Sequence, residues 1–183
     1  MEFITKNLKT VGIINTILIV AVLIAKGITF LGSPVILKVE SIIGAIGLIF
    51  GFIYAYKGYK KEGAKYYKLF MYTYFINSIF PVVLTIVDSG LNKSLILPIV
   101  LRIIILVCIC LLVFVKNFGK TKSFIAIGIV LLINVVRFVS VFFAPNAINA
   151  PLITTSLENL LLAIIAFIFV VCKYADKEAR GTK

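Results

Sequence analysis

Hydrophobic residues in this chain form long uninterrupted runs separated by short polar segments. Six runs occupy approximately residues 10–31, 35–56, 68–88, 95–115, 123–143 and 152–173. Each is about twenty residues long, the length that an α-helix needs to cross the hydrocarbon core of a bilayer. A membrane-spanning β-strand would instead alternate polar and apolar residues over about ten positions. The pattern predicts an all-α polytopic membrane protein, with one transmembrane domain of six helices.

The polar segments alternate in character along the chain. Residues 31–34, 88–97 and 144–151 are rich in Gly, Ser, Asn and Pro, and Lys93 is the only cation among them. The segments between the second and third runs and between the fourth and fifth are basic, as are both ends of the chain. Short turns join antiparallel helices, so we expect three antiparallel helical hairpins.

Basic residues beside the runs are concentrated on one side of the predicted membrane. They are Lys6, Lys9, Lys57, Lys60, Lys61, Lys65, Lys68, Lys116, Lys120, Lys122, Lys173, Lys177, Arg180 and Lys183. Loops on the cytoplasmic side carry the excess of Lys and Arg, so both termini are predicted to be cytoplasmic. Compact turns and Ile/Lys-rich usage indicate a multi-pass protein of a prokaryotic plasma membrane.

Composition fits this assignment, since 62% of the residues are hydrophobic and 14% are charged. The net charge of +12 would suggest nucleic acid in a soluble protein, and residues 54–74 mix tyrosines with lysines. Beside two spans, the same mixture is typical of a membrane interface, with tyrosine rings at headgroup level and lysines facing anionic lipid. We therefore expect the lipid bilayer as a partner and not nucleic acid.

Residues that carry enzyme chemistry are scarce. The sequence contains no histidine, which is the commonest general base and transition-metal ligand. It has neither a Gly-x-Ser-x-Gly nor a His-Glu-x-x-His motif, and Cys108 and Cys110 face different directions on a helix. We expect no catalytic site, metal or cofactor.

A helical hairpin repeat with a period of about sixty residues is one interpretation of two recurring features. An asparagine lies within each odd-numbered run, at Asn15, Asn77 and Asn134, and a proline opens each even-numbered run, at Pro34, Pro98 and Pro151. The alternative is chance similarity between apolar sequences.

Charged residues inside the runs are the most informative, because a charge within the bilayer is costly unless it has a partner or a function. Lys26 and Glu40 lie equally far from the centre of the first turn, and Arg137 and Glu158 from that of the third. We predict ion pairs between Lys26 and Glu40 and between Arg137 and Glu158. Arg102 has no acidic residue at matching depth.

Other polar residues follow helical spacing and should face the bundle interior. On the third run they form the stripe Tyr74, Asn77, Ser78, Pro81, Thr85 and Asp88. On the fifth run Asn134 aligns with Arg137 and Ser140, and on the sixth Thr154 aligns with Glu158 and Thr155 with Asn159.

Two interpretations of these groups compete. Either they pair internally and bind nothing, or surplus cations line an outward-facing pocket for a small anionic or zwitterionic solute or a lipid headgroup. We favour the pocket, because an arginine can hold a carboxylate or phosphate with two parallel hydrogen bonds. The candidate ligand-binding residues are Arg102, Arg137, Lys38, Lys26, Glu158, Glu40, Asn77, Asn134 and Asn159.

Small residues spaced four apart, Ala21 with Ala25 and Gly47 with Gly51, allow close helix packing. They can serve packing within the chain or contact with a membrane-protein partner. With six spans and cytoplasmic termini, the chain resembles the substrate-binding subunits of energy-coupling-factor vitamin transporters, where such a motif lies on span 1. In this chain the motif lies later in the first span than in those subunits, and the turn between the first and second spans is shorter.

The hairpin pattern also resembles small bacterial acid-resistance membrane proteins built from repeated two-helix units. Transport or solute capture is the function we favour. The alternative is an accessory, immunity or stress-response protein that acts through protein–protein contacts.

Overall fold

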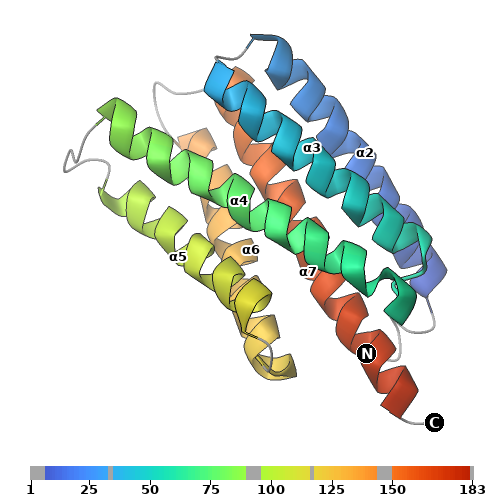
Figure 1. Ribbon diagram of the computed structural model, residues 1–183. Helices are drawn as coiled ribbons and strands as arrows, with labels where there is room; N and C mark the ends of the chain where they lie inside the picture. Colours follow the sequence, from blue (N-terminus) through green and yellow to red (C-terminus); the bar gives the residue numbers. More distant parts are fainter. Residues whose placement is uncertain (1–6, 33–34, 90–95, 116–117, 144–149, 182–183) are drawn as a thin grey trace.

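Helices account for nearly all of the computed structural model, which describes residues 7–32, 35–89, 96–115, 118–143 and 150–181 (Figure 1). The long α-helices are α2 (Leu8–Gly32), α3 (Val35–Tyr56), α4 (Ala64–Ser89), α5 (Ile96–Phe114), α6 (Lys120–Phe143) and α7 (Ala150–Gly181). A short 3-10 helix, η1 (Lys61–Gly63), precedes α4. The all-α prediction is confirmed, and each long helix coincides with one predicted run.

Five of these helices, all except α4, are long and apolar enough to cross a membrane. The described part of α4 is less apolar because Lys65, Lys68 and several tyrosines occupy its first half, and Asn77 and Ser78 follow. Length and composition therefore support a multi-pass membrane protein. That α4 also crosses the membrane stays a prediction.

The helices are arranged as a closed ring. Each long helix packs against its neighbours in the sequence, α7 packs against α2, and α4 touches α7 across the ring. We call the end where α2 begins and α7 finishes the terminal end, and the opposite end, where α2, α4 and α6 finish, the distal end (Figure 1). Contact between α7 and α2 brings together residues from the first and last runs.

The ring exposes apolar side chains and buries polar ones. Ile17 is 62% exposed and Leu132 is 63% exposed, whereas Lys26 is 4%, Asn77 4% and Glu158 8% exposed. In a water-soluble protein, by contrast, charged side chains are mostly exposed. Apolar exteriors with polar groups turned inward are expected where hydrocarbon is the solvent.

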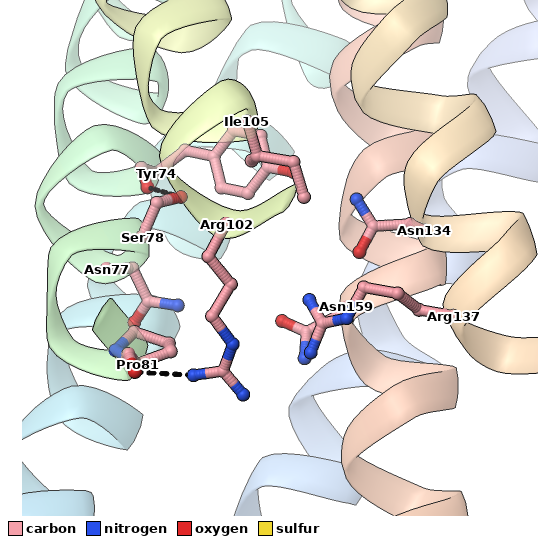
Figure 2. A pocket seen from close by; sticks show the side chains of 9 residues that line it. All are labelled: Tyr74, Asn77, Ser78, Pro81, Arg102, Ile105, Asn134, Arg137 and Asn159. Carbon is pink, nitrogen blue, oxygen red and sulfur yellow. Dashed lines mark hydrogen bonds between the residues drawn. The ribbon is translucent and has the colours of Figure 1, made fainter. Parts of the chain in front are cut away.

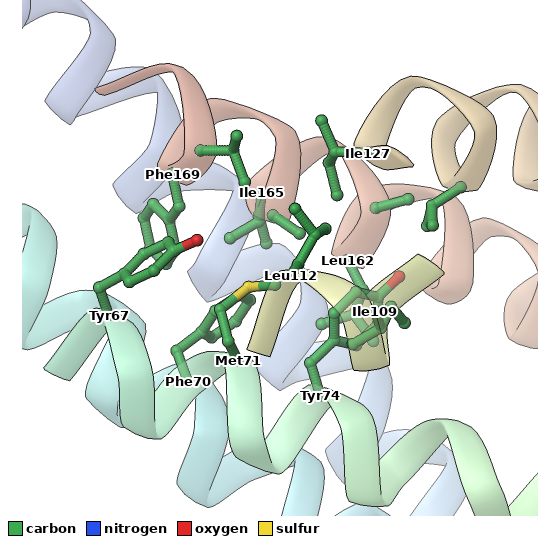
Figure 3. Packing of buried hydrophobic residues seen from close by; sticks show 14 of the residues in the cluster. Tyr67, Phe70, Met71, Tyr74, Ile109, Leu112, Ile127, Leu162, Ile165 and Phe169 are labelled. Carbon is green, nitrogen blue, oxygen red and sulfur yellow. The ribbon is translucent and has the colours of Figure 1, made fainter. Parts of the chain in front are cut away.

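An apolar cluster with residues from all six long helices fills the ring toward the terminal end, and Figure 3 shows its part between α4, α5, α6 and α7. At its centre, the Phe169 ring lies 4.8 Å from that of Phe70 and 5.2 Å from that of Tyr54, centroid to centroid, both edge to face. Tyr54, Tyr59, Tyr67 and Tyr74 are buried. All four face the ring interior, as the polar stripe predicted for Tyr74, and the expected interfacial belt is wrong for Tyr54, Tyr59 and Tyr67.

The connection between α3 and η1 contacts α2 through the Tyr59 side chain. Gly58 and Tyr59 both have left-handed backbone conformations, with φ of 64° and 59°. This turn directs the Tyr59 side chain inward, where its hydroxyl accepts a hydrogen bond from Asn15 Nδ2 at 3.4 Å. Burial raises the pKa of Tyr59 to about 12, so the phenol stays protonated at physiological pH.

The Gly47-x-x-x-Gly51 motif packs within the chain. A Cβ at Gly47 would lie 2.3 Å from Thr73 Oγ1 on α4, and one at Gly51 would lie 3.0 Å from the Phe169 ring. Of the two uses expected for this motif, the structure shows the intramolecular one. Ala21, in contrast, is exposed on α2.

Candidate functional site

A polar cavity lies between α4, α5, α6 and α7, on the distal side of the apolar cluster. Its described lining consists of Tyr74, Asn77, Ser78, Pro81, Arg102, Ile105, Asn134, Arg137 and Asn159. Figure 2 shows the Arg102 and Arg137 side chains entering the same space, Arg102 from α5 and Arg137 from α6. Five of the predicted ligand-binding residues thus meet in one place: Arg102, Arg137, Asn77, Asn134 and Asn159.

The order of residues along each helix explains the position of the cavity. On α5, Arg102 and Ile105 line it, while Cys108, Ile109 and Leu112 belong to the apolar cluster. Arg102 lies six residues after the start of α5 and Arg137 six before the end of α6, which places both about 9 Å from the distal helix ends. The cavity therefore lies in the distal half of the bundle, with apolar packing beneath it.

The two arginines have different surroundings. Arg102 Nη1 donates a hydrogen bond to the carbonyl oxygen of Pro81 on α4. Among the described residues, no acidic side chain forms an ion pair with Arg137. The two guanidinium groups repel each other, because both carry positive charge in the same cavity. An anion between them would remove this repulsion.

Amides and hydroxyls supply the remaining polar lining. Asn134 Nδ2 donates to the carbonyl of Val130 at 2.8 Å, and Asn159 Nδ2 donates to that of Thr155 at 2.9 Å. Each of these bonds fixes an asparagine against its own helix and uses one of its two N–H groups. The second N–H of each amide is left to donate to a bound acceptor.

Asn77 links the cavity to a second polar group. It is 4% exposed, and its Oδ1 has no hydrogen-bond partner in the described structure. Besides the cavity, it lines a space of about 10 Å³ beside Gly44, Gly47 and Thr73. A buried acceptor left without a partner costs about 1–3 kcal/mol. The partner that Asn77 Oδ1 lacks is a hydrogen-bond donor and not an anion, and the oxygen lies on the side of Gly44, where a Cβ would be 3.3 Å from it.

An ion pair between Lys26 of α2 and Glu158 of α7 lies next to this region. The predicted pairs Lys26–Glu40 and Arg137–Glu158 are therefore wrong. Both assumed partners within one hairpin, but the contact between α7 and α2 brings the acid of the last helix to the lysine of the first. Glu40 of α3 stays close enough to interact electrostatically with Lys26, Glu158 and Arg102.

Lys38 does not line the cavity. Its ammonium group lies over the Phe30 ring, with Nζ 5.6 Å from the ring centroid, and its side chain is partly exposed. A lysine near a helix end can place its charge at the membrane surface in this way. The structure thus separates Lys38 from the other predicted ligand-binding residues.

Four lining residues were outside the predicted ligand-binding set. Tyr74, Ser78 and Pro81 belong to the polar stripe of the third run, so helical spacing contained the signal for them. Ile105 gave no signal, since an isoleucine in an apolar run is unremarkable. The side chains of Thr85 and Asp88, the rest of that stripe, lie outside the described residues.

The three asparagines of the proposed repeat are all buried, but they do not form equivalent sites. Asn77 and Asn134 line the cavity, whereas Asn15 contacts Tyr59 nearer the terminal end. Of the three prolines, Pro98 and Pro151 occupy the first turns of α5 and α7, and Pro34 lies outside the described residues. The hairpin repeat stays a prediction.

The cavity is small, with a volume of about 30 Å³. That is room for a few water molecules or for one compact charged group, so a large ligand would place only one end in it. Two guanidinium groups surrounded by amides suit an oxyanion, because all of these groups present N–H donors.

Comparison with known proteins identifies no family. No family model matches the chain, and no curated protein or solved structure matches it. Neither the resemblance to vitamin-transporter subunits nor the resemblance to acid-resistance proteins is supported by these comparisons. What the cavity can bind is therefore inferred from its own geometry and charge.

Proposed function

We propose that this chain is a six-span protein of a prokaryotic plasma membrane that binds, and in the fuller form of the proposal transports, a small anionic or zwitterionic solute or a lipid headgroup. The observation that carries the proposal is the meeting of Arg102 and Arg137, from two helices, in one cavity. Arg137 has no acidic partner among the described residues. Its charge is costly at this depth unless a ligand neutralises it.

The chemistry of the lining favours an anion over a cation. Both charged lining groups are arginines, and the described lining contains no carboxylate. A charged hydrogen bond from a guanidinium to an oxyanion is roughly twice as strong as a neutral one. In a zwitterionic solute the carboxylate would take this position, and its ammonium group would be directed toward Glu40.

The proposed orientation follows from the charges at the two ends of the ring. Lys57, Lys60, Lys173 and Lys177 lie toward the terminal end, so the positive-inside rule directs that end to the cytoplasm. Three antiparallel hairpins with both termini inside satisfy this rule. The cavity, in the distal half, is then nearer the outer surface.

A thermal-shift measurement on the purified full-length protein tests the proposal. Acetate, nitrate and phosphate are added to protein in neutral detergent, and phosphatidylglycerol is compared with phosphatidylcholine in nanodiscs. We expect at least one anion to raise the unfolding temperature of the wild type and to have little effect on Arg137→Gln. Stabilisation by soluble anions indicates a solute site, whereas stabilisation by phosphatidylglycerol alone indicates a headgroup site.

Lys122→Gln is the matched control, because it removes one positive charge from the same helix at the exposed terminal end. This variant should respond to anions as the wild type does. Equal responses in wild type and Arg137→Gln would place anion binding elsewhere, and no response to any anion would contradict the proposed function.

The small cavity volume favours a second candidate, an accessory membrane protein that acts through protein–protein contacts. In that case Arg137 and the asparagines serve only the packing of the ring. The expected results are that no anion or lipid stabilises the protein and that another membrane protein purifies with it from mild detergent. Exposed Ala21 and partly buried Ala25 on α2 are the sites to test for that contact.

A further inference from the structure

The side-chain amide of Asn77 lies between the arginine cavity and the buried ion pair. Asn77 is 4% exposed and lines the cavity together with Arg102 and Arg137. On its other side, the heavy atoms of other helices nearest to a Cβ built at Gly44 are Lys26 Cε, Lys26 Nζ at 2.8 Å and Asn77 Oδ1 at 3.3 Å. The amide oxygen and the ammonium group therefore adjoin the same point beside Gly44.

Which end of this amide faces the cavity decides what the cavity can bind. The NH2 group of an asparagine only donates hydrogen bonds and the oxygen only accepts them, although the two groups have nearly the same shape. An NH2 group directed into the cavity favours an anion, whereas an oxygen there would repel it. Figure 2 shows the nitrogen of the Asn77 amide on the side of Arg102, the orientation that suits an anion.

Arg102 by itself would turn the amide the opposite way. A guanidinium has N–H donors and no acceptor, so an amide beside it would present its oxygen. An ammonium group has the same preference, and Lys26 Nζ lies on the Gly44 side of the amide. Lys26 is 4% exposed, so its charge acts in surroundings of low dielectric constant. It attracts the Asn77 oxygen away from the cavity.

We propose that Lys26 is a positioning residue for anion binding, which orients the Asn77 amide so that its NH2 group faces the cavity. This inference rests on the proposed function and adds to it a residue from outside the cavity lining. Glu158 contributes by holding the ammonium group through the ion pair. The space of about 10 Å³ lined by Gly44 and Asn77 is about what one water molecule needs, so the ammonium group can act directly or through one water.

Anion affinity in a set of variants tests the inference. Dissociation constants for acetate, nitrate and phosphate are measured by isothermal titration calorimetry at constant ionic strength, using the full-length protein in neutral detergent. Asn77→Leu removes the amide. Lys26→Met with Glu158→Leu removes the ion pair and leaves the net charge unchanged, so net charge cannot cause a change in affinity. A further variant combines all three substitutions.

We expect Asn77→Leu to weaken binding of the best-bound anion roughly tenfold, as for the loss of one hydrogen bond to a charged group. The variant without the ion pair should lose at least as much, because the released amide can turn its oxygen toward Arg102 and the anion. Combining all three substitutions should cause no further loss. Loosened packing would instead lower the affinity to the same extent with or without the Asn77 amide.

Ser78→Ala is the matched control, because Ser78 lines the same cavity but its hydroxyl donates to the carbonyl of Tyr74 at 2.8 Å. In a Ser78→Ala background, removal of the ion pair should keep its full effect. Gly44→Ala repeats the test without removing a charge, should the variant without the ion pair fail to fold. Its methyl group would lie next to both Lys26 Nζ and Asn77 Oδ1, and it should weaken binding only when Asn77 is present.

Unchanged anion affinity in the variant without the ion pair would overturn the inference, as would losses that add when Asn77→Leu is combined with it. Either result leaves the anion site itself standing. If the wild type binds none of the three anions, the proposed function is contradicted, and the role of Lys26 with it.

Discussion

At the scale of single residues, a glycine makes the buried ion pair possible. A Cβ built at Gly44 of α3 would lie 2.4 Å from Lys26 Cε and 2.8 Å from Lys26 Nζ. The missing side chain therefore leaves the space through which the ammonium group reaches Glu158. This role could not be predicted from the sequence, because Gly44 lies in an apolar run and is not part of the Gly47-x-x-x-Gly51 motif.

Gly44→Ala should destabilise the protein, because the added methyl group would meet Lys26 Cε and Nζ, and Lys26 would have to shift while it is paired with Glu158. We expect a loss of about 1–3 kcal/mol in the free energy of unfolding, the usual range for overpacking. Gly128→Ala on α6 is the matched control, because a Cβ there meets no atom within 4 Å. Denaturant unfolding in detergent measures both. Equal effects of the two substitutions would contradict the proposed role of Gly44.

Lys26→Met should be more damaging, because it leaves the Glu158 carboxylate buried without its cation. Removing one partner of a buried pair typically costs about 3–5 kcal/mol. Replacing both partners, as Lys26→Met with Glu158→Leu, should restore most of this loss. The same unfolding measurement checks the double variant, and additive losses would show that the two side chains do not act as a pair.

How much of the site the sequence predicts also depends on scale. It identified the cavity residues Arg102, Arg137 and Asn77, because a polar residue in an apolar run is conspicuous and hydrocarbon forces it inward. It did not identify the partner of Lys26. That partner depends on which helices are in contact. Counting residues from a turn gives the relative depth of two residues only when both lie on the helices that the turn connects.

At the scale of helices, glycines on α3 determine how closely α4 can approach. Gly47 faces Thr73 of α4, and Gly51 faces Phe169 of α7 and Phe70 of α4. Thr73 Oγ1 in turn donates to the carbonyl of Phe70 at 2.8 Å, which keeps the hydroxyl bonded to its own helix. The close approach of α3 and α4 holds the Asn77 face of α4 toward the cavity.

Gly47→Leu should separate α3 from α4 and lower the unfolding temperature in detergent. Ala21→Leu makes a substitution of the same kind on α2, at an exposed position, and should leave the unfolding temperature nearly unchanged. Differential scanning fluorimetry measures both variants. A larger loss in Ala21→Leu than in Gly47→Leu would indicate that the α2 surface is the more important packing face.

Helix positions were predictable because each span must be long and apolar, a requirement that leaves a strong pattern in the sequence. The burial of Tyr54, Tyr59 and Tyr67 could not be predicted in this way. Tyrosine suits both a membrane interface and a protein interior, and local sequence does not separate the two. The turn at Gly58 and Tyr59, which brings one of these rings inward, depends on left-handed backbone conformations that the sequence alone did not indicate.

For the whole molecule, the contact between α7 and α2 is the feature with the widest consequences. It closes the ring and forms the Lys26–Glu158 pair. No short-range pattern predicts it, because the two helices lie at opposite ends of the chain. The hairpin arrangement and the orientation in the membrane are still predictions from turn composition and charge.

A fusion experiment checks the orientation. With both termini cytoplasmic, green fluorescent protein attached after Lys183 should be fluorescent in bacterial cells, and alkaline phosphatase at the same position should be inactive. A phosphatase inserted in the segment 90–95 should be active. The reverse pattern would place the cavity toward the cytoplasm and contradict the proposed direction of access.

Anomalous diffraction from crystals of the full-length protein grown with bromide locates a bound anion most directly. We predict a bromide peak within hydrogen-bonding distance of the guanidinium groups of Arg102 and Arg137, and its loss in Arg137→Gln crystals. Bromide at the lysines of the terminal end, with none between the two arginines, would contradict an anion site in this cavity.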